Sequence, residues 1–254
     1  MSRPPASTAS APASTTASPA AARLGHPRVH LRRTDSTNTR AAELARSGAP
    51  HGTLVSADEQ TAGRGRHGRS WSAPPRSSAL ISLVLRDVPP LLPLLAAVAV
   101  CEVTGIQTRV KWPNDIVLER EGRLVKLAGI LTEGRPQEGW AVLGIGLNVA
   151  TVLEDLPGEV RARAATLGET PKQIEPIIGR LVASIEERLG EEAAAILEAW
   201  RARDALRGRE IAWKEGHGRA VGVDDSGHLL VECPDGSELA LQAAEVHLQD
   251  YSSA

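Results

Sequence analysis

Aromatic residues are scarce in this sequence, whose 254 residues contain no Phe and a single Tyr. Leu, Val, Ile, Ala and the five Trp must therefore fill the hydrophobic core. Proteins that bind single-stranded nucleic acid stack bases on aromatic side chains, so this scarcity counts against that class. An excess of positive charge is missing too, since 29 Lys and Arg face 31 Asp and Glu. A net charge of −2 argues against a protein that coats duplex DNA, because that task requires neutralised phosphates.

Motifs for disulfides and metal ions are absent as well. The two cysteines, Cys101 and Cys233, lie far apart and outside any Cys-x-x-Cys pair, so neither a disulfide framework nor a structural zinc site is indicated. Both lie among apolar residues, and we expect both to be buried. The seven histidines show no His-Glu-x-x-His spacing, which argues against a zinc hydrolase. These counts fit a protein of the reducing cytoplasm.

No stretch of the sequence predicts export or membrane insertion. Residues 1–26 are mostly Ala, Ser, Thr and Pro without an apolar segment, so a secretory signal is not indicated and a disordered tail is expected. The most apolar stretch, Val88 to Val103, contains three prolines and is too short to span a bilayer. We therefore expect a soluble, cytoplasmic protein with no membrane partner.

From Pro27 onward, hydrophobic periodicity predicts strands that adjoin strands as often as helices, which is typical of an α+β domain with a mixed sheet. The predicted helices are Thr39–Ser47, Leu91–Val103, Glu175–Leu189 and Glu191–Ala205. The predicted strands are Thr53–Ala57, Ala79–Leu85, Thr108–Trp112, Asp115–Leu118, Arg123–Glu133 and Trp140–Val149, with a turn at Gly134–Gly139 between the last two. Residues 60–76 follow neither period and are expected to form a loop.

The character of the sequence changes after Gly208. Short strands are predicted at Glu210–Trp213, Gly218–Val223, His228–Cys233 and Glu238–Leu241, with Gly, Pro and Asp in the turns between them. This spacing is typical of a small β-barrel or sheet. We therefore expect two folded units, residues 27–206 and residues 207–250.

Positive charge is concentrated in the predicted loop. Residues 61–86 contain five arginines and no carboxylate, and Gly63, Gly65 and Gly68 are interleaved with the first three arginines. Glycine lets the backbone approach a ligand closely, and guanidinium groups donate forked hydrogen bonds to phosphate or carboxylate. The pattern favours a flap over an anionic ligand, although a solvated surface loop would have the same composition.

Two nucleotide-binding motifs are excluded. Gly63-x-Gly65-x-x-Gly68 has the spacing of the dinucleotide-binding motif, but no helix is predicted after it, as that motif requires. The Walker pattern Gly-x-x-x-x-Gly-Lys-Ser/Thr does not occur. Any nucleotide must therefore be held in another way.

Lys126 lies inside one of the predicted strands. In a regular strand it shares a face with Leu124, Ala128 and Ile130, which puts an ammonium group among apolar side chains. Burial without a partner would be costly, whereas an anion at 4 Å and an effective dielectric constant near 20 contributes about 4 kcal/mol. That anion is either a resident carboxylate or a ligand, and the neighbouring Gly129 leaves room for a substrate.

Two turns carry further polar groups at strand ends. Lys111-Trp112-Pro113-Asn114-Asp115 brings a lysine, an amide and a carboxylate to one tight turn, with a tryptophan face that could support a planar ring. Gly144-Ile145-Gly146-Leu147-Asn148-Val149 places two glycines in a strand, where glycine is weak unless another group packs on it. An ordinary turn for the first and a β-bulge with a capping Asn for the second remain open.

Together and in this order, these segments resemble the motifs of biotin protein ligases (biotin–[acetyl-CoA-carboxylase] ligases). The matching segments are Asp35-Ser36-Thr37-Asn38, Glu59 to Trp71, Lys111 to Asp115, Lys126 to Glu133 and Gly144 to Val149. The resemblance implies a class II synthetase-like catalytic domain, with a mixed sheet flanked by helices, and a C-terminal SH3-like β-barrel. The helix-turn-helix domain of the bifunctional ligase–repressors has no counterpart in the sequence, so a monofunctional ligase without DNA binding is expected.

The resemblance also implies a two-step reaction. Biotin reacts with Mg-ATP to give biotinyl-5′-AMP, and a lysine of a biotin carboxyl carrier protein domain then takes the biotinyl group. Biotin, ATP and that carrier domain are the expected partners. No residue is assigned to Mg²⁺, which is expected to arrive with ATP. A homodimer is left open.

Site residues are carried over from the same motifs. Lys126, which would bridge the biotin carboxylate and the α-phosphate, and Arg66, which would close over the adenylate, are the catalytic candidates. The expected biotin-binding residues are Ser36, Thr37, Asn38, Gln60, Arg64, Gly65, Arg66, Lys126 and Gly129. The expected ATP-binding residues are Arg66, Arg69, Trp71, Lys111, Asn114, Asp115, Lys126 and Asn148. Trp71 would pack on the adenine, and Asp115 would orient Lys111 or Lys126.

Two alternatives remain. A lipoate ligase or octanoyltransferase of the same fold also depends on a lysine, although the Gly-Arg-Gly-Arg-x-Gly-Arg segment argues against it. A nucleic-acid-binding protein would use the arginine-rich loop and the C-terminal strands, but the net charge and the lack of aromatic residues argue against it.

Overall fold

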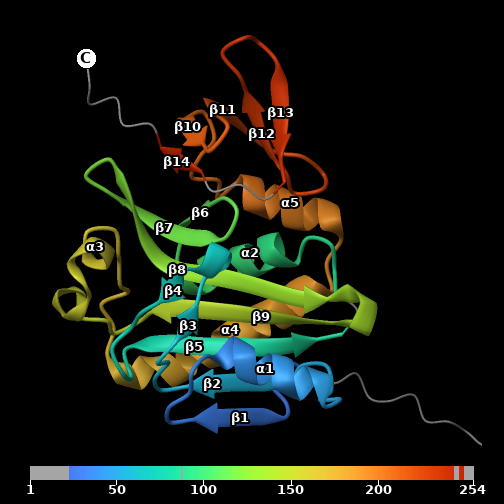
Figure 1. Cartoon of the computed structure of the whole chain (residues 1–254), viewed down its shortest axis with the longest axis vertical. Coiled ribbons are helices and arrows are strands. Elements are labelled where there is room, and N and C mark those ends of the chain that lie inside the picture. The colour runs from blue at the N-terminus through green and yellow to red at the C-terminus, as the bar shows by residue number, and fades with distance from the viewer. Residues whose placement is uncertain (1–22, 87, 243–245, 249–254) are drawn as a thin grey trace, which may run out of the picture.

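The computed structural model describes residues 23–86, 88–242 and 246–248, which form two main β-sheets and five α-helices (Figure 1). The larger sheet has seven strands in the spatial order β1 (Arg28–Leu31), β2 (Leu54–Ala57), β5 (Ser78–Leu85), β9 (Trp140–Asn148), β8 (Arg123–Arg135), β7 (Asp115–Arg120) and β6 (Arg109–Lys111). β1 pairs with β2 in parallel and the other neighbours are antiparallel. The predicted mixed sheet is confirmed.

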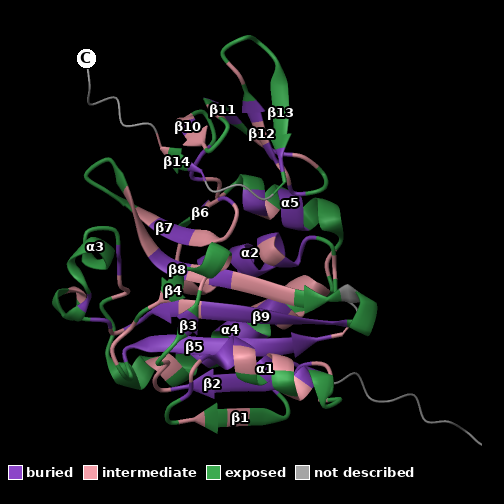
Figure 2. Cartoon of the chain, viewed as in Figure 1, coloured by how far each residue is buried: buried purple, intermediate pink, exposed green. Residues whose placement is uncertain are grey.

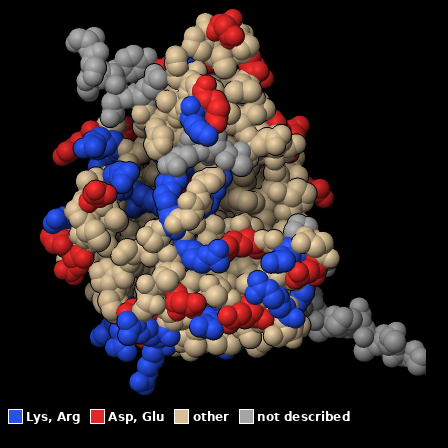
Figure 3. Space-filling view, in the orientation of Figure 1, with Lys and Arg blue, Asp and Glu red and all other residues tan. Residues whose placement is uncertain are grey.

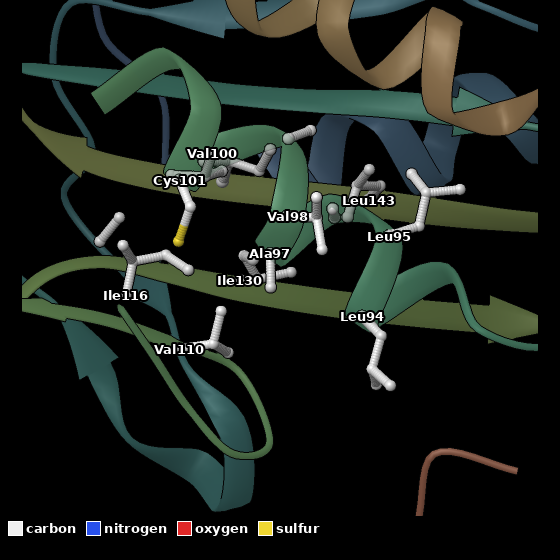
Figure 4. Packing of buried hydrophobic residues seen from close by; sticks show 14 of the residues in the cluster. Leu94, Leu95, Ala97, Val98, Val100, Cys101, Val110, Ile116, Ile130 and Leu143 are labelled. Atoms are coloured by element: carbon white, nitrogen blue, oxygen red, sulfur yellow. The ribbon is translucent and has the colours of Figure 1, made fainter. Parts of the chain in front are cut away.

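Helices cover both faces of this sheet. α1 (Thr37–Arg46) packs on one face, and α2 (Leu92–Thr104) packs on the other with α4 (Ile174–Leu189) and α5 (Ala193–Arg201) against it. Burial on both faces explains why β5 and β9 read as nearly continuous apolar runs (Figure 2). The side chains of α2 lie against β8 and β9, where Ile130 and Leu143 meet them (Figure 4).

Two predicted elements differ from the structure because tertiary pairing overrides the local pattern. The helix predicted to run to Ala205 ends at Arg201, since Val110 of β6 accepts the N–H of Ala205 at 2.9 Å and donates to the carbonyl of Arg203 at 2.7 Å. The loop predicted at residues 60–76 contains a short antiparallel hairpin of β3 (Gly63–Arg64) and β4 (Ser70–Trp71).

Smaller differences lie at the ends of elements. β8 runs on to Arg135, which shortens the turn predicted at Gly134–Gly139. β1 and the one-turn helix α3 (Gly158–Arg161) had no sequence signal. The predicted tail, residues 1–26, lies mostly outside the described residues. Leu24 is buried and its N–H donates to Glu186 at 2.9 Å, so the packed chain begins before residue 27.

The second sheet is formed by the C-terminal residues. It is antiparallel throughout, with the spatial order β13 (Glu238–Leu241), β12 (Leu229–Glu232), β11 (Gly216–Val223), β10 (Glu210–Trp213) and β14 (His247–Leu248). Cys233 beside β12 is only partly buried, so the expected burial is wrong for this cysteine and right for Cys101. Within the described ranges, no helix is long and apolar enough to cross a membrane.

Candidate active site

A cavity of about 530 Å³ lies on the α1 side of the larger sheet, beside the first turn of that helix. Its walls come from α1, the β3–β4 hairpin, the β6–β7 turn, β8, β9 and the segment at residues 156–164. Every site residue proposed from the sequence lines this one cavity, although the residues are spread over more than a hundred positions of the chain. Lys and Arg side chains gather in the middle of the same face of the molecule (Figure 3).

The floor of the cavity is made of glycines. Gly129 of β8 pairs with Gly146 of β9, and a Cβ added at Gly146 would lie 2.6 Å from the indole ring of Trp71. A Cβ added at Gly144 would lie 1.9 Å from Oδ1 of Asn38. The pairing of β9 with β5 and β8 is continuous, so the bulge considered for this segment is wrong. Glycine is required because two side chains pack directly on the strand.

The polar wall of the cavity is at the start of α1. Oε1 of Gln60 accepts the Thr37 N–H at 2.7 Å and the Thr37 hydroxyl at 3.0 Å. Ser36 is the N-cap residue but makes no side-chain cap bond, and Gln60 satisfies the N–H of the first helical residue, which has no partner within the helix. Asn38 is held by the Ser82 hydroxyl, 2.6 Å from its Oδ1. Thr37 and Asn38 are buried and fixed in position.

Lys126 reaches this cavity because of a β-bulge. The pairing of β8 with β7 shifts between Ile116 and Val117, which leaves Leu127 without a partner on β7. The alternation of side chains is thereby reversed, and the Lys126 ammonium lies 3.2 Å from where a Cβ of Gly129 would be. The predicted placement of Lys126 on the face of Ala128 and Ile130 is wrong, since those two residues point into the core.

The anionic partner of Lys126 is Asp115, whose Oδ1 lies 2.6 Å from Nζ. The lysine side chain keeps 38% of its exposure, so this ion pair borders the cavity. The Trp71 ring lies 5.7 Å from the same ammonium group, within cation–π range. Asp115 was expected to orient Lys111 or Lys126, and it forms an ion pair with Lys126. The sequence left open whether a resident carboxylate or a ligand neutralises Lys126, and the structure shows both a carboxylate partner and an adjoining cavity that could hold a ligand.

We call residues 63–71 the flap, since the β3–β4 hairpin lies over β8 and β9 (Figure 1). Arg64 forms a 2.7 Å ion pair with Glu133 of β8. Arg66 donates to Oδ1 of Asn114 at 3.5 Å, the outer limit of a hydrogen bond. The Gly65 N–H donates to the Arg69 carbonyl at 2.7 Å, which closes the hairpin.

The two asparagines expected near the nucleotide hold the backbone of the site. Asn114 donates to the Ile130 carbonyl at 2.7 Å, and Asn148 donates to the Ala165 carbonyl at 2.9 Å. Each fixes the turn or strand end beside it. Trp112 is 2% exposed and donates to Gly227 of the C-terminal sheet at 3.0 Å, so the expectation that its face supports a ligand ring is wrong.

One wall of the cavity had no sequence signal. Leu156, Val160 and Arg163 come from residues 156–164, and His247 comes from β14 of the C-terminal sheet. Residues 163–165 reach the site because the Lys126 N–H donates to the Arg163 carbonyl at 2.6 Å and the Ala165 N–H donates to the Lys126 carbonyl at 2.7 Å. Only these backbone hydrogen bonds, next to the bulge in β8, show that residues 163–165 lie beside the site.

Comparison with known proteins agrees with this geometry. The family model described as biotin/lipoate A/B protein ligase matches residues 30–149, and that of the biotin protein ligase C-terminal domain matches residues 207–249. The bifunctional ligase/repressor BirA of Bacillus subtilis is 36% identical over 84% of this chain and 71% of that protein. The biotin–[acetyl-CoA-carboxylase] ligase of Paracoccus denitrificans is 35% identical over 85% of this chain and 98% of its own length.

A solved structure is similar as well. The biotin protein ligase from Aquifex aeolicus in complex with biotin and ATP superposes with a TM-score of 0.72 at 27% identity. The match covers 87% of this chain and 98% of that one, so it includes both sheets.

Proposed function

This chain belongs to the biotin/lipoate A/B protein ligase family, and from that premise we propose that it is a biotin–[acetyl-CoA-carboxylase] ligase. It activates biotin with ATP and transfers the biotinyl group to a lysine of a carrier protein domain. The observation that supports this most is Lys126, an ammonium group beside a cavity that also holds the flap arginines and the polar start of α1.

In the first step, a carboxylate oxygen of biotin attacks the α-phosphorus of ATP, and the bond from that phosphorus to the pyrophosphate oxygen breaks. An anion must approach a polyanion, so cations fixed at the developing charge lower the barrier. In this proposal Lys126, which borders the cavity, contacts both the carboxylate and the α-phosphate. The ion pair with Asp115 holds the ammonium group at the edge of the cavity.

The biotin end of the cavity is the wall at Ser36, Thr37, Asn38 and Gln60. A ureido ring needs both donors and acceptors, and hydroxyl and amide groups supply them with no charge to be desolvated. Gly144 keeps this wall close to the sheet. Arg64, Gly65 and Gly129 border the path toward Lys126.

The nucleotide end is formed by Arg66, Arg69, Trp71, Lys111, Asn114, Asp115 and Asn148. The indole of Trp71 offers a planar surface for the adenine, and the arginines and Lys111 suit the phosphates. Asn114 and Asn148 act on this end through the backbone that they hold.

The protein residues do not fit a dedicated Mg²⁺ site. No cluster of three His, Cys, Asp or Glu side chains occurs in the described part of the chain. Two nearby carboxylates, Asp115 and Glu133, each pair with a cation of the protein. Mg²⁺ would therefore enter as the counter-ion of the ATP phosphates, as is common for this metal.

In the second step, the ε-amine of the carrier lysine attacks the carbonyl carbon of biotinyl-5′-AMP. An amide bond forms, AMP leaves with the bonding electron pair, and the amine loses a proton. The flap shields the mixed anhydride from water until the lysine arrives. The carrier is a biotin carboxyl carrier protein domain, and the reaction takes place in the cytoplasm.

Incubation with labelled biotin, ATP and a purified carrier domain tests the proposal. Label is expected on one carrier lysine, and pyrophosphate exchange is expected without the carrier. Lys126→Ala should lower the exchange rate by about 10²- to 10³-fold, as loss of one such electrostatic contact does, while Lys172→Ala at an exposed position should leave it unchanged. Transfer of lipoate in place of biotin would favour the other activity of the family.

A further inference from the structure

Glu133 has no role in the function proposed above, although it lies beside the cavity. It follows Gly129 and Leu131 on the site-facing side of β8, and its side chain is 31% exposed. Its two oxygens contact different elements of the fold. Oε1 pairs with Arg64 of the flap at 2.7 Å, and Oε2 accepts from Nδ2 of Asn38 in α1 at 3.0 Å.

The contact with Asn38 fixes the orientation of that amide. An ionised carboxylate only accepts hydrogen bonds, so the group of Asn38 that faces Glu133 must be the amide nitrogen. The same nitrogen donates to the Leu131 carbonyl at 3.3 Å, and Oδ1 is left facing the Ser82 hydroxyl and Gly144. Glu133 therefore determines which atom of Asn38 lies against the glycine floor.

The contact with Arg64 holds the flap to the sheet. A separation of 2.7 Å is typical of a charge-assisted hydrogen bond. Arg64 lies in the two-residue strand β3, whose only sheet partner among the described residues is β4. The flap is thus attached to the large sheet by side chains, and Glu133 provides one of these attachments.

We propose that Glu133 is a positioning residue that couples closure of the flap to occupation of the biotin end. This rests on the proposed function. One carboxylate serves both the flap arginine and the amide at the ligand wall, so a ligand that contacts Asn38 acts on the same carboxylate that accepts from Arg64. Coupling between sites is reciprocal, so a closed flap strengthens biotin binding by the same factor, typically about 5- to 150-fold.

Limited trypsin digestion tests this directly, because the flap carries arginines. Cleavage after Arg64 and Arg66 is followed by mass spectrometry with and without biotin. In the wild-type protein biotin is expected to slow this cleavage. In Glu133→Gln, cleavage without ligand should be faster by about tenfold, and biotin should protect much less, because a neutral amide cannot hold both partners as an acceptor.

Two further variants separate positioning from general stability. Glu133→Asp keeps the charge and should recover part of the protection. Glu119→Gln removes a carboxylate of β7 that pairs with Arg209 away from the flap, and should digest like the wild type. In a double-mutant cycle, the losses of biotin affinity in Arg64→Ala and Glu133→Gln should be less than additive, since both variants remove the same ion pair.

The outcomes distinguish this inference from the proposed function. If biotin protects the wild-type flap and protects Glu133→Gln equally, the coupling is overturned and the ligase proposal stands. If biotin binds neither protein but Glu133→Gln opens the flap, the ligase proposal fails and the attachment by Glu133 holds without coupling to biotin. If the variant digests like the wild type with and without biotin, Glu133 does not position the flap.

Discussion

At the scale of the residue, two glycines of β9 shape the cavity by what they lack. Asn38 lies against Gly144 and Trp71 lies against Gly146, each closer than any Cβ would allow. The site is therefore built from pairs of a glycine and a large or polar side chain. The space that the glycine leaves empty is filled by the group that would contact the ligand.

Gly144→Ala is expected to displace Asn38, because its added Cβ would lie 1.9 Å from Oδ1. We expect biotin affinity to fall at least about tenfold and the free energy of unfolding to fall by about 1–3 kcal/mol. Calorimetric titration and urea unfolding measure the two effects. Gly134→Ala on β8 is the control, since its nearest neighbour would be an ordinary 3.5 Å contact. Equal biotin affinity in the two variants would disprove the close fit at Gly144.

At the scale of the element, the flap is a hairpin too short to be stable alone. β3 and β4 contribute two residues each, and isolated hairpins are marginal in water even when longer. Its position depends on Arg64, Arg66 and the indole of Trp71, which packs on the glycine floor. An element held this way opens at little cost, which suits a cover that must admit two substrates and retain an intermediate.

Arg66→Gly removes one of these contacts and is expected to let biotinyl-5′-AMP escape. Escaped adenylate acylates amines at random, so we expect label on bystander lysines, several-fold above the wild type in a mixture with an unrelated protein. Arg76→Gly is the matched control, because Arg76 follows the flap, pairs with Asp58 and already has a φ of 57°. A labelling pattern that does not change in Arg66→Gly would rule out a retaining role for this arginine.

At the scale of the whole molecule, the two sheets are joined through buried contacts. Trp112 donates to the Gly227 carbonyl, and a Cβ at Gly227 would lie 3.1 Å from Leu94 of α2. Arg201 at the end of α5 donates to the Val223 carbonyl of β11 at 3.0 Å. His247 of the C-terminal sheet lines the cavity. The second sheet is thus part of the site, and the boundary proposed at residue 207 stays a prediction.

Asp204 lies where α5 gives way to the pairing with β6, and burial raises the pKa of its carboxyl group. Oδ1 accepts the Leu206 N–H at 2.8 Å, whereas Oδ2 is buried without a hydrogen-bond partner in the described residues. The folded state therefore binds a proton more tightly than the unfolded state. The protonated carboxyl group contributes stability at low pH. This contribution is lost as the pH rises from about 4, the pKa of an unfolded aspartate, through the raised pKa of the folded state.

Asp204→Asn removes this titratable group, so the free energy of unfolding should depend less on pH above about pH 4. We expect the variant to be more stable than the wild type by about 1 kcal/mol at pH 7, with the difference vanishing below about pH 3.5, where both side chains are neutral. Urea unfolding across this pH range measures the free energy of unfolding of both proteins. The contributions of the other carboxylates cancel in the difference, because both proteins contain them. A difference that does not depend on pH would contradict the assignment.

Much of the fold followed from local pattern. The bounds of the apolar helix α2, the amphipathic helix α4 and the buried strands β5 and β9 were predicted within about two residues. Burial of one or both faces of an element produces a recognisable hydrophobic periodicity in its sequence. β1 was not, since its alternation of exposed and partly buried residues is weak at a sheet edge. The end of α5 was missed because a partner strand competes there with helix propensity.

The sequence by itself determined most of the lining of the cavity, since the motifs that resemble one family supplied a set of residues that all border it. Only the tertiary structure decided how Lys126 faces that cavity, because a bulge depends on the register of two strands. It also decided that Asp115 pairs with Lys126, that Trp112 is buried against Gly227 and that Glu133 joins the flap to α1. Local sequence cannot encode these contacts, since each joins elements that are brought together only when the sheet assembles.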